Sequence, residues 1–99
     1  MPSHGGIDLI KILVSKKLYR YSSKVESFLE DGYYTTEDIE LCIETGSVYK
    51  VERDEQKNSI GNKKYVIKGK DTCGNDFYTA GKIINCDGGR VYFLITAHQ

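Results

Sequence analysis

The spacing of the apolar residues changes near the middle of this 99-residue chain, and this change constrains the fold more than any other feature. In residues 7–46 apolar residues recur every three or four positions, which is the repeat of an amphipathic helix. In residues 47–99 they alternate with polar residues, which is the repeat of a half-buried strand. Helices followed by strands are typical of the α+β class. The sequence therefore predicts N-terminal helices packed on an antiparallel meander of three to four strands.

The helical half is expected to follow a flexible lead at residues 1–6, where no apolar repeat is present. The apolar residues from Ile10 to Leu29 predict one long helix, and Ser22 and Ser23 offer a place where it breaks and a second helix begins. A further helix is expected before residue 46, because Thr35 and Asp38 have the spacing of a capping box.

The second half contains several strand patterns. Val48 and Val51 open one expected strand, and a second over residues 65–68 is closed by Gly69. A third covers residues 77–84, and the turn Asp87–Gly89 joins it to a last strand. Simple alternation along that last strand predicts two faces, Val91, Phe93, Ile95 and Ala97 on one and Tyr92, Leu94, Thr96 and His98 on the other.

Length and composition favour one domain over residues 1–99. The three cysteines are odd in number and widely spaced, which indicates reduced thiols and a cytoplasmic protein. No apolar stretch is long enough for a membrane span. The apolar segment Ile7–Val14 is expected either to pack on the sheet or to pair with its copy in a homodimer.

Charge is distributed unevenly along a chain whose formal net charge is zero. Residues 1–30 carry five basic and three acidic groups, residues 31–56 two basic and eight acidic, and residues 57–99 seven basic and three acidic. The expected sheet is therefore basic and the helix before it acidic. A basic sheet can bind a polyanion, and the alternative is that its lysines only protect exposed strand edges from pairing.

The chain resembles the small bacterial proteins of the domain of unknown function 4258 family. The resemblance covers about residues 21–98 and consists of segments in a shared order: Tyr21–Gly32, Tyr34–Glu40, Thr45–Val48, Asn62–Gly69 and Tyr92–Ala97. It implies a fold like that of RelE-type and barnase-like RNases, with helices packed on an antiparallel sheet. It also implies RNA binding, a metal-independent endoribonuclease activity of the toxin–antitoxin type, and an antitoxin-like protein partner.

The chain departs from the family where members usually carry a histidine and arginines. Ser23, Ser27 and Asp31 occupy those positions here. Serine and aspartate do not provide the cationic phosphate contact that arginine does. The alternative function is therefore a non-catalytic protein-interaction module of the same fold.

Cleavage of RNA without a metal or other cofactor requires a proton acceptor, a cation near the phosphate and a proton donor. His98 is the one histidine in the strand-rich half and is our candidate proton carrier. Lys64 and Lys68 share one face of their expected strand and are the candidate cations. We predict that these three residues form the catalytic cluster.

A second set of residues is expected to bind the RNA rather than to react with it. Tyrosines on a sheet surface stack on unpaired bases, and exposed arginines and lysines contact phosphates. The predicted substrate-binding residues are Tyr78, Tyr92, Lys82, Arg90 and Arg53. No residue is assigned to a metal, and no cofactor is expected.

Overall fold

The computed structural model describes residues 5–56 and 59–99 and has the predicted α+β architecture. Its elements follow the order α1 (Gly5–Ser15), β1 (Tyr19–Tyr21), α2 (Ser23–Glu30), α3 (Thr36–Thr45), β2 (Ser47–Arg53), the 3₁₀ turn η1 (Ile60–Asn62), β3 (Lys63–Lys70), β4 (Asp76–Cys86) and β5 (Gly89–His98). Of the expected lead, residues 1–4 lie outside the described part, whereas Gly5 and Gly6 already belong to α1. No described helix is long and apolar enough to cross a membrane.

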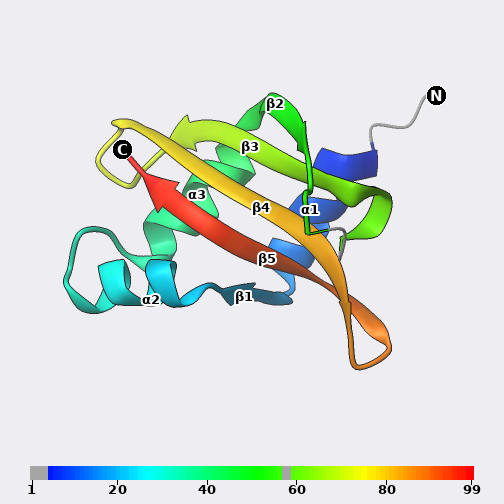
Figure 1. Ribbon diagram of the computed structural model, residues 1–99. Helices are drawn as coiled ribbons and strands as arrows, with labels where there is room; N and C mark the ends of the chain where they lie inside the picture. Colours follow the sequence, from blue (N-terminus) through cyan, green and yellow to red (C-terminus); the bar gives the residue numbers. More distant parts are fainter. Residues whose placement is uncertain (1–4, 57–58) are drawn as a thin grey trace.

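The strands form one sheet in the order β1-β5-β4-β3-β2 (Figure 1). Strands β2 to β5 pair in sequence as antiparallel neighbours, which confirms the predicted meander. Strand β1 adds a fifth member that pairs in parallel with β5 at the edge of the sheet. The α+β fold class is therefore as predicted, but the sheet has five strands where the sequence predicts three to four.

Strand β1 lies where the sequence predicts the middle of a long helix. Helix α1 ends before Lys17, whose φ of 62° is in the left-handed region and turns the chain away. The segment Tyr19–Tyr21 then pairs with β5, since aromatic residues suit a strand. Ser22 caps α2, and its Oγ accepts a hydrogen bond from the Val25 N–H at 3.2 Å. The predicted break at the two serines is confirmed, but a strand separates the two helices.

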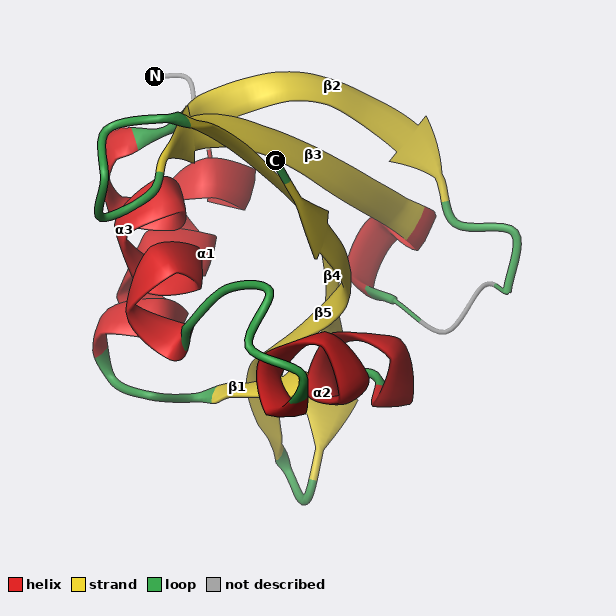
Figure 2. Ribbon diagram, turned by 90° about the vertical axis from the view of Figure 1, so that its left-hand side faces the viewer, coloured by secondary structure: helices red, strands yellow, loops and turns green. Residues whose placement is uncertain are grey.

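Helices α1 and α3 cover one face of the sheet, and α2 lies beside β5 and β1 (Figure 2). The core lies between these helices and the sheet. Its fully buried members come from helices and strands alike, among them Ile10, Val25, Ile39, Cys42, Ile43, Ile67, Phe77, Tyr92 and Leu94. Ile10, Leu13 and Val14 pack into this core, as the first of the two alternatives for Ile7–Val14 expects, whereas Ile12 is 50 % exposed. We call the opposite face of the sheet the open face.

Helix α3 approaches β3 so closely that the strand needs a glycine at the contact. A Cβ atom built on Gly69 would lie 2.1 Å from the carbonyl oxygen of Cys42 in α3, far inside van der Waals contact. The sequence predicts Gly69 as the end of the strand, but β3 continues through it to Lys70. The residue marks a close backbone approach rather than a strand end.

Strand β5 does not alternate simply along its length. Ile95 has no partner in the register with β4, which makes it the extra residue of a β-bulge. Because of this extra residue, Tyr92 and Leu94 before the bulge and Ala97 after it are all buried in the core. His98 is exposed beside β4 on the open face. The prediction that Tyr92 and His98 share a face is wrong.

Two local predictions are confirmed. Asp87 and Gly88, with φ of 52° and 81°, turn the chain between β4 and β5 as a two-residue hairpin loop requires. Thr35 and Asp38 form the capping box at the start of α3. The Asp38 carboxylate also accepts hydrogen bonds from the N–H and the hydroxyl of Thr72, at 2.9 and 2.6 Å, and so ties α3 to the β3–β4 turn.

The close approach at Gly69 predicts a large loss of stability for Gly69→Ala. The added methyl collides with helix backbone that cannot rotate away, and overpacking of this kind costs at least about 2 kcal/mol. Gly89→Ala is the control, because the nearest atom to a Cβ there lies at 3.9 Å and the change should stay within about 0.5 kcal/mol. Urea denaturation followed by circular dichroism measures both. Equal effects of the two substitutions would contradict the inferred contact.

The hydrogen bonds to Asp38 predict a pH-dependent contribution to stability. Burial raises the pKa of this carboxyl, but the hydrogen bonds from Thr72 and Thr35 outweigh it and leave the pKa below its ordinary value of 3.8. The contribution is complete above the ordinary pKa and is lost as the pH falls through the lowered one. Asp38→Asn should cost about 1–2 kcal/mol at neutral pH and progressively less in acid.

Glu37→Gln is the matched control for this prediction, since the exposed Glu37 lies in the same helical turn and the charge change is identical. Chemical denaturation at neutral pH and at several acid pH values gives the comparison. A penalty for Asp38→Asn that stays constant down to about pH 2 would show that the carboxylate is not the source of the effect.

Candidate nucleic-acid interface

Three of the predicted site residues form one row across the open face. The strand register places Lys68 of β3 opposite Tyr78 of β4, and Tyr78 opposite His98 of β5. The His98 and Tyr78 rings are stacked, with centroids 5.4 Å apart and planes inclined by 18°. The Lys68 ammonium lies 5.7 Å from the centroid of the Tyr78 ring, within the range of a cation–π contact. We call these residues the Lys68–Tyr78–His98 row.

A fourth residue, the aromatic Tyr49, extends the row onto β2. Tyr49 sits at an irregularity in the pairing of β2 with β3, and its ring meets the Tyr78 ring nearly edge-on at 6.1 Å. It is 63 % exposed. Tyr49 is not among the predicted binding residues, because simple alternation does not show where a bulge turns a side chain. Its position three residues after a helix-ending glycine is the one signal available, and it is weak.

Lys68 lies near the Asp76 carboxylate but is not its ion-pair partner. Lys70, two residues further along β3, forms an ion pair with Asp76 at 2.7 Å. The hydrogen bond and charge of Lys70, followed by the charge of Lys68, lower the pKa of the Asp76 carboxyl. Among the residues that the structure describes, Lys68 itself has no ion pair. Its ammonium is therefore available to a phosphate.

The His98 imidazole is exposed at the end of β5. Its Nδ1 lies 3.1 Å from the carbonyl oxygen of Gln99. A carbonyl only accepts hydrogen bonds, so Nδ1 carries the proton in this contact and Nε2 is the basic nitrogen of the neutral ring. The geometry thus leaves His98 with one atom that can accept a proton from a bound molecule.

Lys64, the third member of the predicted catalytic cluster, does not reach the row. It shares the open face with Lys68, but four residues of extended strand separate the two by roughly 13 Å. Lys64 instead lines a pocket of about 370 Å³ in the middle of the open face, together with Lys82 and the segment Asp54–Gln56. The predicted cluster is therefore divided between two places.

Lys82 is buried rather than open to substrate. It is 3 % exposed, and its ammonium lies 3.4 Å from the Asp54 carboxylate and 3.1 Å from the Gln56 side-chain oxygen. Burial raises the pKa of Asp54, but hydrogen bonds from Ser59 and Gln56 and the charge of Lys82 outweigh it and hold the pKa below its ordinary value. The predicted phosphate contact is thus corrected to a buried pair that fastens the β2–β3 connection over the sheet.

The remaining predicted binding residues lie apart from the row. Arg53 is exposed at the end of β2 and Arg90 is exposed beside the β4–β5 hairpin, both far along the sheet from His98. Tyr92 is fully buried against the helices and offers no ring face to a ligand. No group of three or more His, Cys, Asp or Glu side chains within residues 5–56 and 59–99 is arranged to hold a metal ion.

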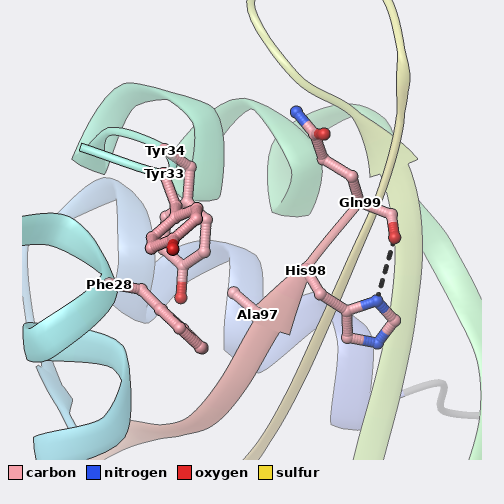
Figure 3. A pocket seen from close by; sticks show the side chains of 6 residues that line it. All are labelled: Phe28, Tyr33, Tyr34, Ala97, His98 and Gln99. Carbon is pink, nitrogen blue, oxygen red and sulfur yellow. Dashed lines mark hydrogen bonds between the residues drawn. The ribbon is translucent and has the colours of Figure 1, made fainter. Parts of the chain in front are cut away.

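A cavity lies at the end of β5, on the opposite side of that strand from the Tyr78 ring. Phe28, Tyr33, Tyr34, Ala97, His98 and Gln99 line a cavity of about 290 Å³, which we call the aromatic pocket (Figure 3). The Phe28 ring meets the Tyr33 ring edge-on at 5.2 Å and the Tyr34 ring at 6.0 Å. The His98 ring points away from these three rings, toward the open face.

Comparisons of the chain with protein-family models, with curated proteins and with solved structures give no match in any of the three. The resemblance to the domain of unknown function 4258 family therefore stays a prediction.

Proposed function

We propose that the protein binds single-stranded RNA across the open face of its sheet. The Lys68–Tyr78–His98 row is the observation that carries the proposal. It combines a cation with a pair of stacked rings, and these are the two groups that a single strand uses: its phosphates need positive charge and its bases need a flat surface.

The stacked pair supports base recognition. Unpaired bases of RNA stack on aromatic side chains of exposed sheets, and each stack contributes about 1–3 kcal/mol. Tyr78 is half-buried and held between neighbours, whereas His98 and Tyr49 are exposed beside it. Rings that are already in contact lose little freedom when a base is added, so this surface is organised before binding.

The two lysines of β3 indicate the path of the RNA backbone across the open face. Lys64 and Lys68 lie on the same face of β3, and within the described residues Lys68 forms no ion pair, although its charge acts on the Asp76 carboxylate. A strand of RNA that follows β3 would place two of its phosphates near the two ammonium groups. Contacts of this kind make binding weaker as salt is added.

RNA cleavage is the further step of the proposal. His98 Nε2 is the candidate proton acceptor and Lys68 the candidate cation for the phosphorane charge. Strand β4 lies between β3 and β5, so these two groups approach the Tyr78 ring from opposite sides. This separation favours contacts to two different nucleotides over joint action on one phosphate, and it supports binding more directly than catalysis.

The alternative, a protein-interaction module, is favoured by a different observation. Strand β2 is an edge of the sheet, and its Tyr49 and Val51 side chains are 63 % and 50 % exposed. An exposed edge strand can pair with a strand of another protein. In this case an antitoxin-like partner would cover β2, and substitutions of Lys68 or His98 would leave its binding unchanged.

RNA binding predicts that His98→Ala and Lys68→Ala each weaken binding of a fluorescently labelled single-stranded oligonucleotide. Loss of one base stack or one phosphate contact corresponds to about a 5- to 50-fold increase in Kd. Both residues are exposed, so the fold should be retained, and circular dichroism checks this. Fluorescence anisotropy at two salt concentrations measures the affinities, and Lys68→Ala should reduce the salt dependence.

Lys16→Ala is the matched control, because Lys16 is an exposed lysine after α1 and the charge change equals that of Lys68→Ala. Its effect should be under about twofold. The same RNA is then separated by gel electrophoresis. Fragments formed by the wild type but not by His98→Ala indicate a ribonuclease, whereas bound, intact RNA indicates a binding protein. Equal Kd values for all four proteins would overturn the proposed interface.

A further inference from the structure

We infer that the aromatic pocket holds a single unpaired nucleobase of the bound RNA, an inference that rests on the proposed function. The pocket lies at the end of β5, on the opposite side of that strand from the Tyr78 ring, and it belongs to none of the interactions assigned above. It is a second binding site with its own chemistry.

The volume of the aromatic pocket selects a small ligand. Sites for drug-sized molecules measure about 300–1,000 Å³, so a cavity of about 290 Å³ accepts one ring system and little more. Three aromatic side chains and the Ala97 methyl group surround it. Such walls match a flat, apolar-faced ring.

The lining also excludes an anionic group. It contains no lysine, arginine, aspartate or glutamate, and the His98 ring points to the other side of the strand. A phosphate would find no cation here. The neutral part of a nucleotide is its base. The polar edge of a base can meet the Gln99 side-chain amide, because the amide nitrogen donates one hydrogen bond to the Asp71 carboxylate at 3.4 Å and keeps a second N–H and the amide oxygen for a ligand.

The walls are held in place before any ligand arrives. Tyr34 is buried, and its ring meets the core residue Phe77 edge-on at 5.3 Å as well as the Phe28 ring. Tyr33, by contrast, is 67 % exposed and touches only the rim of this cluster through Phe28. The pocket therefore has a rigid back and one exposed ring on which a base can stack.

The position of the pocket connects it to the Lys68–Tyr78–His98 row. Ala97 directs its methyl group to the pocket and the next residue, His98, directs its ring to Tyr78. A strand of RNA that crosses the end of β5 can stack one base on the exposed face of the His98 ring, whose other face meets Tyr78, and place another base in the pocket. Two sites on one strand strengthen binding, because the second contact becomes intramolecular.

The test titrates the full chain with the free ribonucleosides adenosine, cytidine, guanosine and uridine at millimolar concentrations. The Ala97 methyl resonance is the NMR reporter, since that group lines the pocket. Tyr33→Ala should raise the nucleoside Kd at least about fivefold, as expected for loss of one stacking ring. Tyr33→Phe keeps the ring and should bind like the wild type. Leu18→Ala, an exposed apolar residue outside the pocket, is the control.

The oligonucleotide titration is run in parallel so that the two proposals fail separately. A perturbed Ala97 methyl and a fivefold loss confined to Tyr33→Ala support the pocket. Oligonucleotide binding without nucleoside binding overturns the pocket and leaves RNA binding by the row intact. Nucleoside binding that Tyr33→Ala does not weaken also overturns the pocket. If neither ligand binds, both the pocket and the proposed function are wrong.

Discussion

The close contact between α3 and the sheet is the constraint on which the rest of the structure depends. Glycines permit it on both elements: a Cβ on Gly69 of β3 would lie 2.1 Å from the Cys42 carbonyl oxygen, and one on Gly46, which follows α3, would lie 2.5 Å from the Lys68 carbonyl oxygen. With its backbone against β3, the helix fills the core face together with α1. Surface for a ligand is then left on the open face and at the ends of the sheet.

The bulge at Ile95 decides which side chains occupy that surface. Without the extra residue, the alternation that buries Tyr92 and Leu94 would also turn His98 toward the helices. With it, Ala97 completes the core and His98 stacks on Tyr78. The Ser22 hydroxyl, which donates to the Ile95 carbonyl at 2.8 Å, holds the bulge against the chain segment that leads into α2. One irregular residue thus produces both the row and the back of the aromatic pocket.

The sequence predicts those features that local chemistry determines. The capping box at Thr35 and the hairpin turn at Asp87 each need only a few neighbouring residues, and both are confirmed. Strand β1 was not predicted, because its pairing with β5 joins residues more than seventy positions apart. Tyr92 and Lys82 were placed wrongly for a related reason. A bulge further along the strand puts Tyr92 and His98 on opposite faces, and the loop that carries Asp54 covers Lys82. The sequence predicts the cluster of Lys68, Tyr78 and His98 in part. Residues an even number of positions apart on a regular strand such as β3 share one face, so the face of Lys68 can be predicted.

The arrangement of the Lys68–Tyr78–His98 row favours RNA binding over RNA cleavage. Proton transfer at one phosphate needs its acid, base and cation around a single group of atoms. Here Tyr78 stands between Lys68 and His98 and keeps the cation from the imidazole. The same spacing suits a polymer, whose bases and phosphates alternate along its length. A sheet that stacks one base on the exposed His98 ring and holds another in the aromatic pocket, with Lys68 and Lys64 near the backbone, can hold a strand of RNA without reacting with it. Cleavage would require the strand to bend until one phosphate meets both Lys68 and His98, and the flexible side chain of Lys68 is the group with the reach to allow it.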